Sequence, residues 1–134
     1  MAGKAFFIKN GYEVAGVAKP DLELLVKKFN AHTPLPNFRI DPSKDLKKYK
    51  KGLTILRADQ CPYTVKNVRE IIETARKKYD LKTNLINFTS YRDAQKSPCP
   101  FGIFCIIYNG KIVAEHPISR KRFENILNKL ELSE

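Results

Sequence analysis

The sequence predicts an α/β protein with a mixed four-stranded sheet and flanking helices from about Gly52 onward, preceded by a helix-strand-strand segment. Two observations predict the sheet. A short apolar strand leads into a long stretch, over 62–79, in which apolar residues recur at helical spacing. Further on, an apolar run ends in Asn109-Gly110, which is a strong signal for a β-hairpin.

The first thirty residues predict a short helix and two strands. Ala5–Lys9 is typical of the end of a helix, and Asn10-Gly11 stops it, because glycine adopts the left-handed conformation of a helix C-cap. Tyr12–Val17 and the strongly apolar Leu22–Phe29 follow as strands, with a turn at Pro20-Asp21. Two strands and a short helix are too little to close a hydrophobic core alone.

Residues 31–51 differ in composition from the segments on either side. They hold Pro34, Pro36 and Pro42, and a lysine cluster extends over 44–51. This composition indicates a linker or an extended crossing segment.

A strand, a loop and a helix open the second part of the chain. Leu53–Arg57 predicts a short buried strand, and Asp59–Thr64 is the loop that leads into the helix. Apolar residues at helical spacing predict an amphipathic helix over Pro62–Tyr79. Pro62 suits the first helical position, where its missing N–H costs nothing.

The next segment predicts a strand, a short helix and a loop before the hairpin. Leu85–Phe88 is the second strand, and Ser90 caps a helix that runs to about Gln95. Ser97–Pro100 is a constrained loop, because it contains two prolines.

The hairpin and a final helix complete the fold. Phe101–Tyr108 is a long apolar strand, Lys111–Glu115 returns antiparallel to it, and Ser119 starts the last helix. One face of that helix carries Phe123, Ile126, Leu127 and Leu130. Two parallel strands joined by a helical crossover, then a hairpin and a helix, predict a mixed sheet that is covered on both faces.

Composition excludes several classes of protein. No run approaches the roughly 20 apolar residues that cross a bilayer, and the apolar patch near the N-terminus turns polar too soon for a signal peptide. We therefore expect a cytoplasmic protein that does not contact membranes. The net charge of +11 is scattered over lysine-rich surfaces, so we do not expect a nucleic-acid partner.

The three cysteines are Cys61, Cys99 and Cys105. An odd number in a chain without a signal peptide argues against a disulfide framework. His32 and His116 are isolated, so no metal site is predicted. Cys105 lies in the middle of an apolar strand, and we expect it to be a core thiol.

Cys61 is the candidate nucleophile, because it follows a strand and opens a helix. The partial positive charge and unpaired N–H groups of a helix start stabilise a thiolate, which is the reactive form in thiol–disulfide exchange. Arg57 and Lys66 are close in sequence and add positive charge. The alternative is that Cys61 only caps the helix of a non-catalytic module.

The segment Cys61-Pro62-Tyr63-Thr64, followed by a second strand and by a proline ahead of a hairpin, resembles the active site of thioredoxin-like proteins, and of glutaredoxins in particular. The resemblance implies a thioredoxin-like fold in which Pro62, Tyr63 and Thr64 belong to the binding site. Thr64 stands where the family has its resolving cysteine, and a hydroxyl cannot form a disulfide with Cys61. A dithiol cycle within this motif is therefore excluded, whereas a monothiol reaction remains open.

The same resemblance assigns roles to the loop before the hairpin. It implies that Pro100, with Pro98 as second choice, is the cis-proline that lies against the active cysteine and belongs to the binding site. Cys99 would then lie beside Cys61 and can act as its resolving cysteine. A small thiol or a protein would be the substrate. The alternative is a substrate- or partner-binding module without redox activity.

Lys4–Glu13 resembles the end of a GNAT acetyltransferase domain, in which an aromatic pair precedes a Lys-x-Gly-aromatic turn. Two features depart from that family. The Gly-rich turn that binds the pyrophosphate of acetyl-CoA is absent, and Phe7 stands where many members carry a tyrosine general acid. We expect no cofactor in this chain by itself, and acetyl-CoA only where an upstream domain is present.

The order of these two segments along the chain resembles that of YoaP-type proteins, in which a GNAT domain precedes a small thioredoxin-like domain. Two further segments, Ser97–Gly102 and Ile107–Lys111, look like recurring segments of the second domain. They imply a GNAT remnant over 1–30, a linker over 31–51 and a thioredoxin-like domain over 52–134, from a truncated gene or a fragment produced for expression. The open edges of the N-terminal strands predict a homodimer through those strands.

Overall fold

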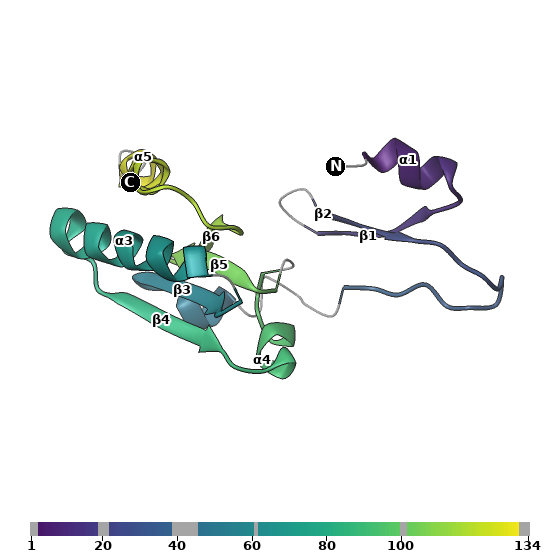
Figure 1. Ribbon diagram of the computed structural model, residues 1–134, viewed down its shortest axis with the longest axis horizontal. Coiled ribbons are helices and arrows are strands. Elements are labelled where there is room, and N and C mark those ends of the chain that lie inside the picture. The colour runs from purple at the N-terminus through teal and green to yellow at the C-terminus, as the bar shows by residue number, and fades with distance from the viewer. Residues whose placement is uncertain (1–2, 19–21, 39–45, 61, 100–101, 132–134) are drawn as a thin grey trace. The chain divides into compact units, whose positions relative to one another are not determined.

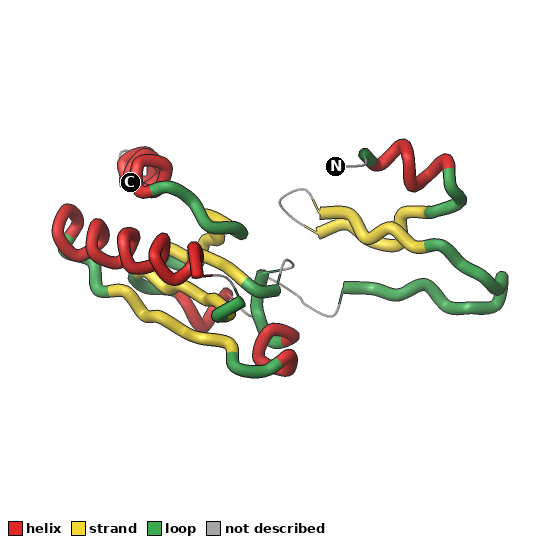
Figure 2. Tube along the Cα trace, viewed as in Figure 1, coloured by secondary structure: helices red, strands yellow, loops and turns green. Residues whose placement is uncertain are grey.

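The structure is a computed structural model that describes residues 3–18, 22–38, 46–60, 62–99 and 102–131 (Figures 1 and 2). The chain divides into two compact units, Met1–Asp41 and Pro42–Glu134, which we call the N-terminal unit and the C-terminal unit. The N-terminal unit holds one helix and a two-stranded sheet, and the C-terminal unit holds a four-stranded sheet with its helices.

The N-terminal unit consists of α1 (Lys4–Lys9), β1 (Glu13–Ala18) and β2 (Leu22–Val26). Gly11, with a φ of +85°, ends the helix in the left-handed conformation that the sequence predicts. The two strands pair antiparallel, with a bulge at Val14/Gly16. The predicted turn at Pro20-Asp21 lies outside the described residues.

Strand β2 is shorter than predicted. The sequence pattern runs apolar to Phe29, but the strand ends at Val26, which pairs with Glu13. The chain turns at Gly11 just before β1 begins, so residues beyond Val26 have no strand beside them to pair with. The Phe29 side chain is 94% exposed as a result.

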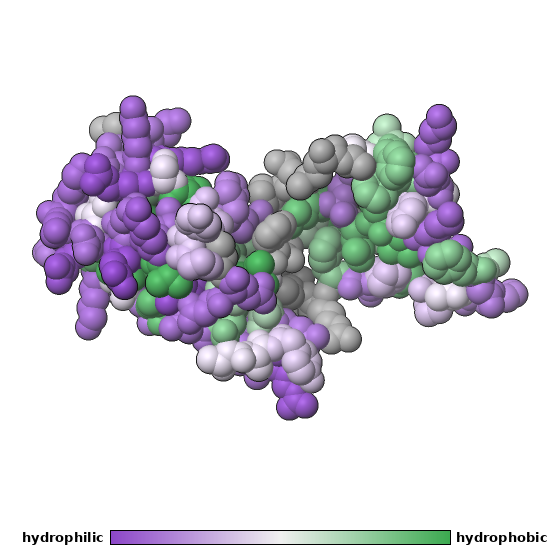
Figure 3. Space-filling view, viewed as in Figure 1, coloured by the Kyte–Doolittle hydropathy of each residue, from purple (hydrophilic) through white to green (hydrophobic). Residues whose placement is uncertain are grey.

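None of the described residues of the N-terminal unit is buried. Its packing consists mainly of surface contacts: the Phe7 ring meets the rings of Phe6 and Tyr12 edge-on at centroid distances of 5.5 and 5.4 Å. Lys4 Nζ lies 2.7 Å from Glu23 Oε1, which ties α1 to β2. Hydrophobic surface extends over this unit in Figure 3. Its exposed large apolar residues are Phe6, Ile8, Val14, Val17, Phe29 and Leu35.

The C-terminal unit has the predicted class, a mixed four-stranded α/β sheet flanked by helices. The strand order is β4-β3-β5-β6; β3 is parallel to β4 and antiparallel to β5, and β6 is antiparallel to β5. Helix α3 has the bounds that its periodicity predicts. The elements are a 3-10 helix η1 (Leu46–Tyr49), β3 (Leu53–Ala58), α3 (Pro62–Tyr79), β4 (Thr83–Phe88), α4 (Tyr91–Gln95), β5 (Phe104–Tyr108), β6 (Lys111–Ala114) and α5 (Arg120–Glu131).

Two hydrophobic clusters, one on each face of this sheet, form its core. The first lies beneath α3 and α5, where Ile71 and Phe123 are fully buried against the strands. The second lies on the opposite face and contains Leu56, Cys99, Cys105 and Ile107, with Leu46 and Tyr49 of η1 packed against it. The predicted burial of both faces is therefore observed, and Cys105 is the core thiol that the sequence predicts.

Strand β5 begins later than the predicted Phe101, which lies outside the described residues. Gly102 has a φ of +81°, and its N–H donates to the carbonyl oxygen of Cys99 at 2.9 Å, so the chain is still turning there. Pairing with β3 begins only at Phe104, opposite Arg57. Strand partners, and not apolar character alone, set the start of this strand.

The hairpin turn has the predicted geometry. Asn109 and Gly110 have φ values of +47° and +77°, as a type I′ turn requires. The Asn109 side-chain oxygen accepts a hydrogen bond from the N–H of Gly52 at 2.8 Å, which ties the turn to the start of β3. A side chain at Gly110 would be strained, because its φ of +77° lies in the left-handed region that favours glycine.

Helices α3 and α5 lie side by side over one face of the sheet (Figure 1). Ser119 caps α5 as predicted: its Oγ accepts from the N–H of Arg122 at 3.2 Å. Near the end of α3, the Tyr79 hydroxyl donates to Asn128 Oδ1 at 2.8 Å, and Lys78 Nζ lies 2.8 Å from Glu124 Oε1.

Replacing Phe123 by alanine will destabilise the C-terminal unit by about 3–5 kcal/mol, because the fully buried ring leaves a cavity that its neighbours fill only in part. Urea unfolding followed by circular dichroism measures the loss. The matched control is Arg122→Ala, an exposed neighbour on the same helix, which will change the free energy of unfolding by less than about 0.5 kcal/mol. Equal effects of the two substitutions would contradict this packing.

Candidate functional site

The candidate site lies where β3 ends and α3 begins. Among its predicted residues, Cys61 and Pro100 lie outside the described residues, so the predicted thiolate geometry and the cis-proline remain predictions. The described neighbours of Cys61 are Asp59 and Gln60 on one side and Pro62 on the other, where α3 starts.

The start of α3 is favourable for a negative charge. Pro62 is its first residue, and its first turn contains no acidic side chain. The unpaired N–H groups and partial positive charge of a helix start are therefore not offset from within the turn. A thiolate or another anion at this end of the helix would be stabilised.

An open groove of about 390 Å³ runs along the first two turns of α3. Tyr63 stands 82% exposed on its wall, and Thr64 lines it as well. Two of the predicted binding residues thus share one surface. The complete lining is Tyr63, Thr64, Lys66, Asn67, Glu70 and Pro117.

Asn67 and Pro117 were not among the residues singled out from the sequence. The Asn67 side-chain amide donates to the carbonyl oxygen of Ile118, which joins α3 to the loop before α5. Its Oδ1 is buried and has no hydrogen-bond partner among the described residues. The spacing of four residues from Tyr63 is a signal for the shared helix face, but nothing local indicates the loop at Pro117.

Arg57 is a buried charge at the end of β3, with 11% of its side chain exposed. Its Nε donates to Asn87 Oδ1 on β4 at 2.8 Å, and its Nη2 lies 3.2 Å from Asp59 Oδ1. A buried guanidinium needs such partners, because its desolvation is otherwise costly. The contact with Asn87 joins Arg57 to β4, and the contact with Asp59 holds the first residue of the loop that leads to α3.

Cys99 and Cys105 are both fully buried in the second hydrophobic cluster, on the face of the sheet away from α3 and α5. Hydrogen bonding to the Cys99 side chain, followed by burial, raises the pKa of the Cys105 thiol above its ordinary value. The raised pKa means that the Cys105 thiol keeps its proton. The main-chain N–H of Cys99 donates to Ser97 Oγ at 3.2 Å.

A capping box at α4 anchors the loop that carries Cys99. Ser90 Oγ accepts from the Asp93 N–H at 3.3 Å, and Asp93 Oδ2 accepts from the Ser90 N–H at 3.0 Å. The Thr89 N–H and hydroxyl also donate to this carboxylate. The Ser90 side chain first, and then the hydrogen bonds from Thr89 and from the Ser90 N–H, hold the pKa of Asp93 below its ordinary value.

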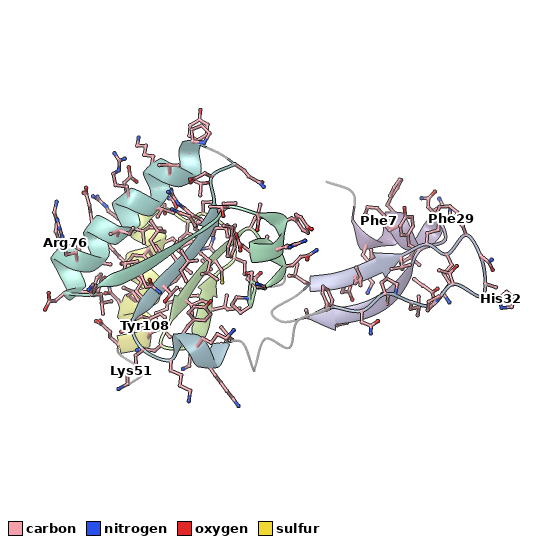
Figure 4. The ribbon with its side chains drawn as sticks, turned by 90° about the horizontal axis from the view of Figure 1, so that it is seen from below. Phe7, Phe29, His32, Lys51, Arg76 and Tyr108 are labelled. Atoms are coloured by element: carbon pink, nitrogen blue, oxygen red, sulfur yellow. The ribbon has the colours of Figure 1, made fainter. Side chains whose placement is uncertain are left out.

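No group of three or more metal-ligating side chains occurs in the part of the chain that the structure describes. His32 lies on the loop that follows β2 in the N-terminal unit (Figure 4). In the same residues, no helix is long and apolar enough to span a bilayer.

The fold and the groove together define a small mixed-sheet α/β protein whose candidate site lies where a helix begins after the central strand. The comparison with known families identifies residues 83–125, from β4 into α5, as a YoaP-like domain. Over 130 residues, which is 97% of the chain, the sequence is 29% identical to "Uncharacterized N-acetyltransferase YoaP" of Bacillus subtilis (strain 168). The YoaP-type resemblance seen in the sequence is confirmed.

The match covers 51% of the Bacillus subtilis protein, so the chain spans about half the length of that relative. No solved structure matches the chain. The YoaP-like domain contains Cys99, Pro100 and Cys105, whereas Cys61 lies outside its bounds.

The carboxyl of Asp93 will titrate below the value of about 3.9 that is usual for aspartate, because the Ser90 side chain and hydrogen bonds from Thr89 and Ser90 favour its charged form. Its contribution to stability is therefore fully present above about pH 4 and is lost as the pH falls through the lower folded value. Carbon-detected NMR titration measures this pKa. In Ser90→Ala it will move back toward the usual value, and an unchanged pKa in that variant would contradict the capping box.

Proposed function

We propose that this chain is the accessory part of a GNAT-type N-acetyltransferase. The observation that carries the proposal is the similarity of 97% of the chain to a protein of about twice its matched length that bears the name N-acetyltransferase. In this proposal the N-terminal unit completes an acetyltransferase domain, and the C-terminal unit is an accessory domain attached to it.

The surface of the N-terminal unit supports the first half of this proposal. A two-stranded sheet without a buried residue is marginally stable at best in water. Phe6 and Val17 are 57% and 70% exposed. Covering such apolar side chains with another layer lowers the free energy, because it removes apolar surface from water. β1 and β2 pair only with each other among the described strands, so each offers an open edge. The occupant that we propose is the remainder of the acetyltransferase domain.

The start of α3 supports a thiol function for the accessory domain. Cys61 directly precedes a helix whose first turn lacks acidic residues, and Arg57 is held at the end of the preceding strand. The helix start and the nearby positive charge favour a thiolate at Cys61. Since Thr64 supplies no second thiol, the chemistry that we propose is a monothiol exchange with a small thiol or a protein substrate.

The groove along α3 favours a second candidate, a binding module without redox chemistry. Its lining combines an exposed aromatic ring, Tyr63, with the charges of Lys66 and Glu70. Such a surface can orient a peptide or a small substrate for the acetyltransferase without any reaction at Cys61. The reactivity of Cys61 separates the two candidates.

Acetyl-CoA will not bind tightly to this chain alone, because no Gly-rich pyrophosphate-binding turn is present in it. Isothermal titration calorimetry with acetyl-CoA measures this, and the full-length Bacillus subtilis relative serves as the positive control. A micromolar dissociation constant for the chain would contradict the division of labour proposed for the two parts. If the full-length relative does not bind acetyl-CoA, the proposal that this chain serves an acetyltransferase is contradicted.

Sedimentation experiments test what covers the apolar surface of the N-terminal unit. A dimer would favour a second copy of this chain over the remainder of the acetyltransferase domain.

Cys61 will be the first cysteine to react with iodoacetamide near neutral pH. A thiolate-favouring helix start raises its rate several-fold above that of an unfolded thiol, whereas Cys99 and Cys105 are fully buried and react slowly. Timed alkylation followed by peptide mass spectrometry measures all three rates in one sample. The matched control is the same chain in urea, where the rates converge. If Cys61 reacts no faster in the folded chain than in urea, the thiol function is contradicted and the binding module without redox chemistry is favoured instead.

A further inference from the structure

We propose that the end of the C-terminal sheet at which β3 begins binds the phosphate backbone of double-stranded DNA, without reading its base sequence. Three segments form this surface, residues 46–53, 80–83 and 108–111, and we call it the basic end. Figure 4 labels two of its residues, Lys51 and Tyr108. The groove along α3 lies where β3 ends, so the two surfaces are separate. The exposed lysines of the basic end are Lys47, Lys48, Lys50, Lys51, Lys82 and Lys111.

Strand pairing holds the three segments of the basic end together. Leu53, the first residue of β3, pairs with Thr83 of β4 on one side and with Tyr108 of β5 on the other. Lys82 directly precedes Thr83, and Lys111 pairs with Tyr108 across the hairpin. Lysines from distant parts of the sequence are therefore carried by neighbouring strands.

The hairpin turn fixes the segment that precedes β3. The Asn109 N–H donates to the carbonyl oxygen of Gly52 at 3.0 Å, and the Gly52 N–H donates to Asn109 Oδ1 at 2.8 Å. A Cβ at Gly110 would lie 3.6 Å from the Cα of Lys50, so the turn packs closely against the end of η1. The lysines on these segments thus project from a backbone that is held in place.

The charge of the basic end is not neutralised within the described part of the chain. All of its lysines except Lys48 form no ion pair with another described residue. Asp80 is the only acidic residue in the sequence of the three segments. Along the sequence the lysines lie far apart, which predicts scattered charge and no nucleic-acid partner, but the fold brings them to one end. A partner with dense negative charge complements this surface.

The other side chains of the basic end favour a DNA duplex over other anionic partners. None of the exposed large apolar side chains of the described residues lies in these segments, whereas membrane surfaces and protein partners are bound with apolar or aromatic anchors. Tyr108 is buried in the first hydrophobic cluster, and Tyr49 packs against the second. No exposed ring is therefore present here on which the bases of a single strand could stack. A duplex backbone requires only cations, which lysine side chains supply.

Fluorescence anisotropy of the full chain with a short fluorescein-labelled DNA duplex tests the proposal. The logarithm of the affinity will fall linearly with the logarithm of the salt concentration between about 50 and 200 mM, with a slope of about −4, because each phosphate contact releases counterions. A second duplex of unrelated sequence will bind equally well. The variant Lys51→Gln/Lys82→Gln/Lys111→Gln will bind at least about tenfold more weakly, and its slope will be shallower by about three.

The matched control is Lys9→Gln/Lys96→Gln/Lys121→Gln, which removes the same charge from exposed lysines outside the basic end. It will keep the slope of the unchanged chain, and circular dichroism checks that both variants are folded. The proposal is overturned if the unchanged chain does not bind the duplex, or if the two variants weaken binding equally. It is also overturned if the first variant loses binding to phosphatidylserine vesicles and retains binding to the duplex. None of these results depends on whether the chain serves an acetyltransferase or on the reactivity of Cys61.

Discussion

Strand β3 is hydrogen-bonded along both edges and covered on both faces, and the rest of the C-terminal unit depends on this double burial. Each residue from Leu53 to Arg57 is buried, and Leu53 and Ile55 lie in the first hydrophobic cluster whereas Leu56 lies in the second. A strand in this position needs a parallel neighbour, an antiparallel neighbour and two covering layers. The parallel neighbour requires a crossover, which is why the long helix α3 follows β3 directly.

The same constraint creates the candidate site. A central strand must end at the edge of the core, and the helix that crosses over must begin there, so Arg57, the loop after it and the N-terminus of α3 come together. Arg57 continues the inward alternation of β3 but carries a charge, and its partners on β4 and in the loop reflect the cost of burying it. The groove follows from the contact of Asn67 with the loop before α5.

The two units differ in how completely they bury their apolar side chains. The C-terminal unit closes two clusters around its sheet, and the YoaP-like domain covers its second half, from β4 into α5. The N-terminal unit carries apolar side chains on a two-stranded sheet and buries none of its described residues. The chain matches about half the length of a protein that bears the name N-acetyltransferase.

Local sequence signals determined most elements, because their physical causes act over a few residues. The bounds of α3 follow from periodicity and Pro62, the hairpin turn follows from Asn109-Gly110, and Ser90 caps α4. The second strand of the N-terminal unit and the first strand of the hairpin were predicted too long, since a strand lasts only as long as its neighbour, which lies elsewhere in the sequence.

Only the tertiary structure decided which side chains meet across the fold. The burial of Cys99 in the same cluster as Cys105 depends on where the loop after α4 enters that cluster, and the contact of Asn67 with Ile118 depends on how α3 and α5 pack. Burial of Arg57 beside Asn87 likewise requires the register of two strands separated by a whole helix. These contacts arise from long-range packing, for which a single sequence carries no local signal.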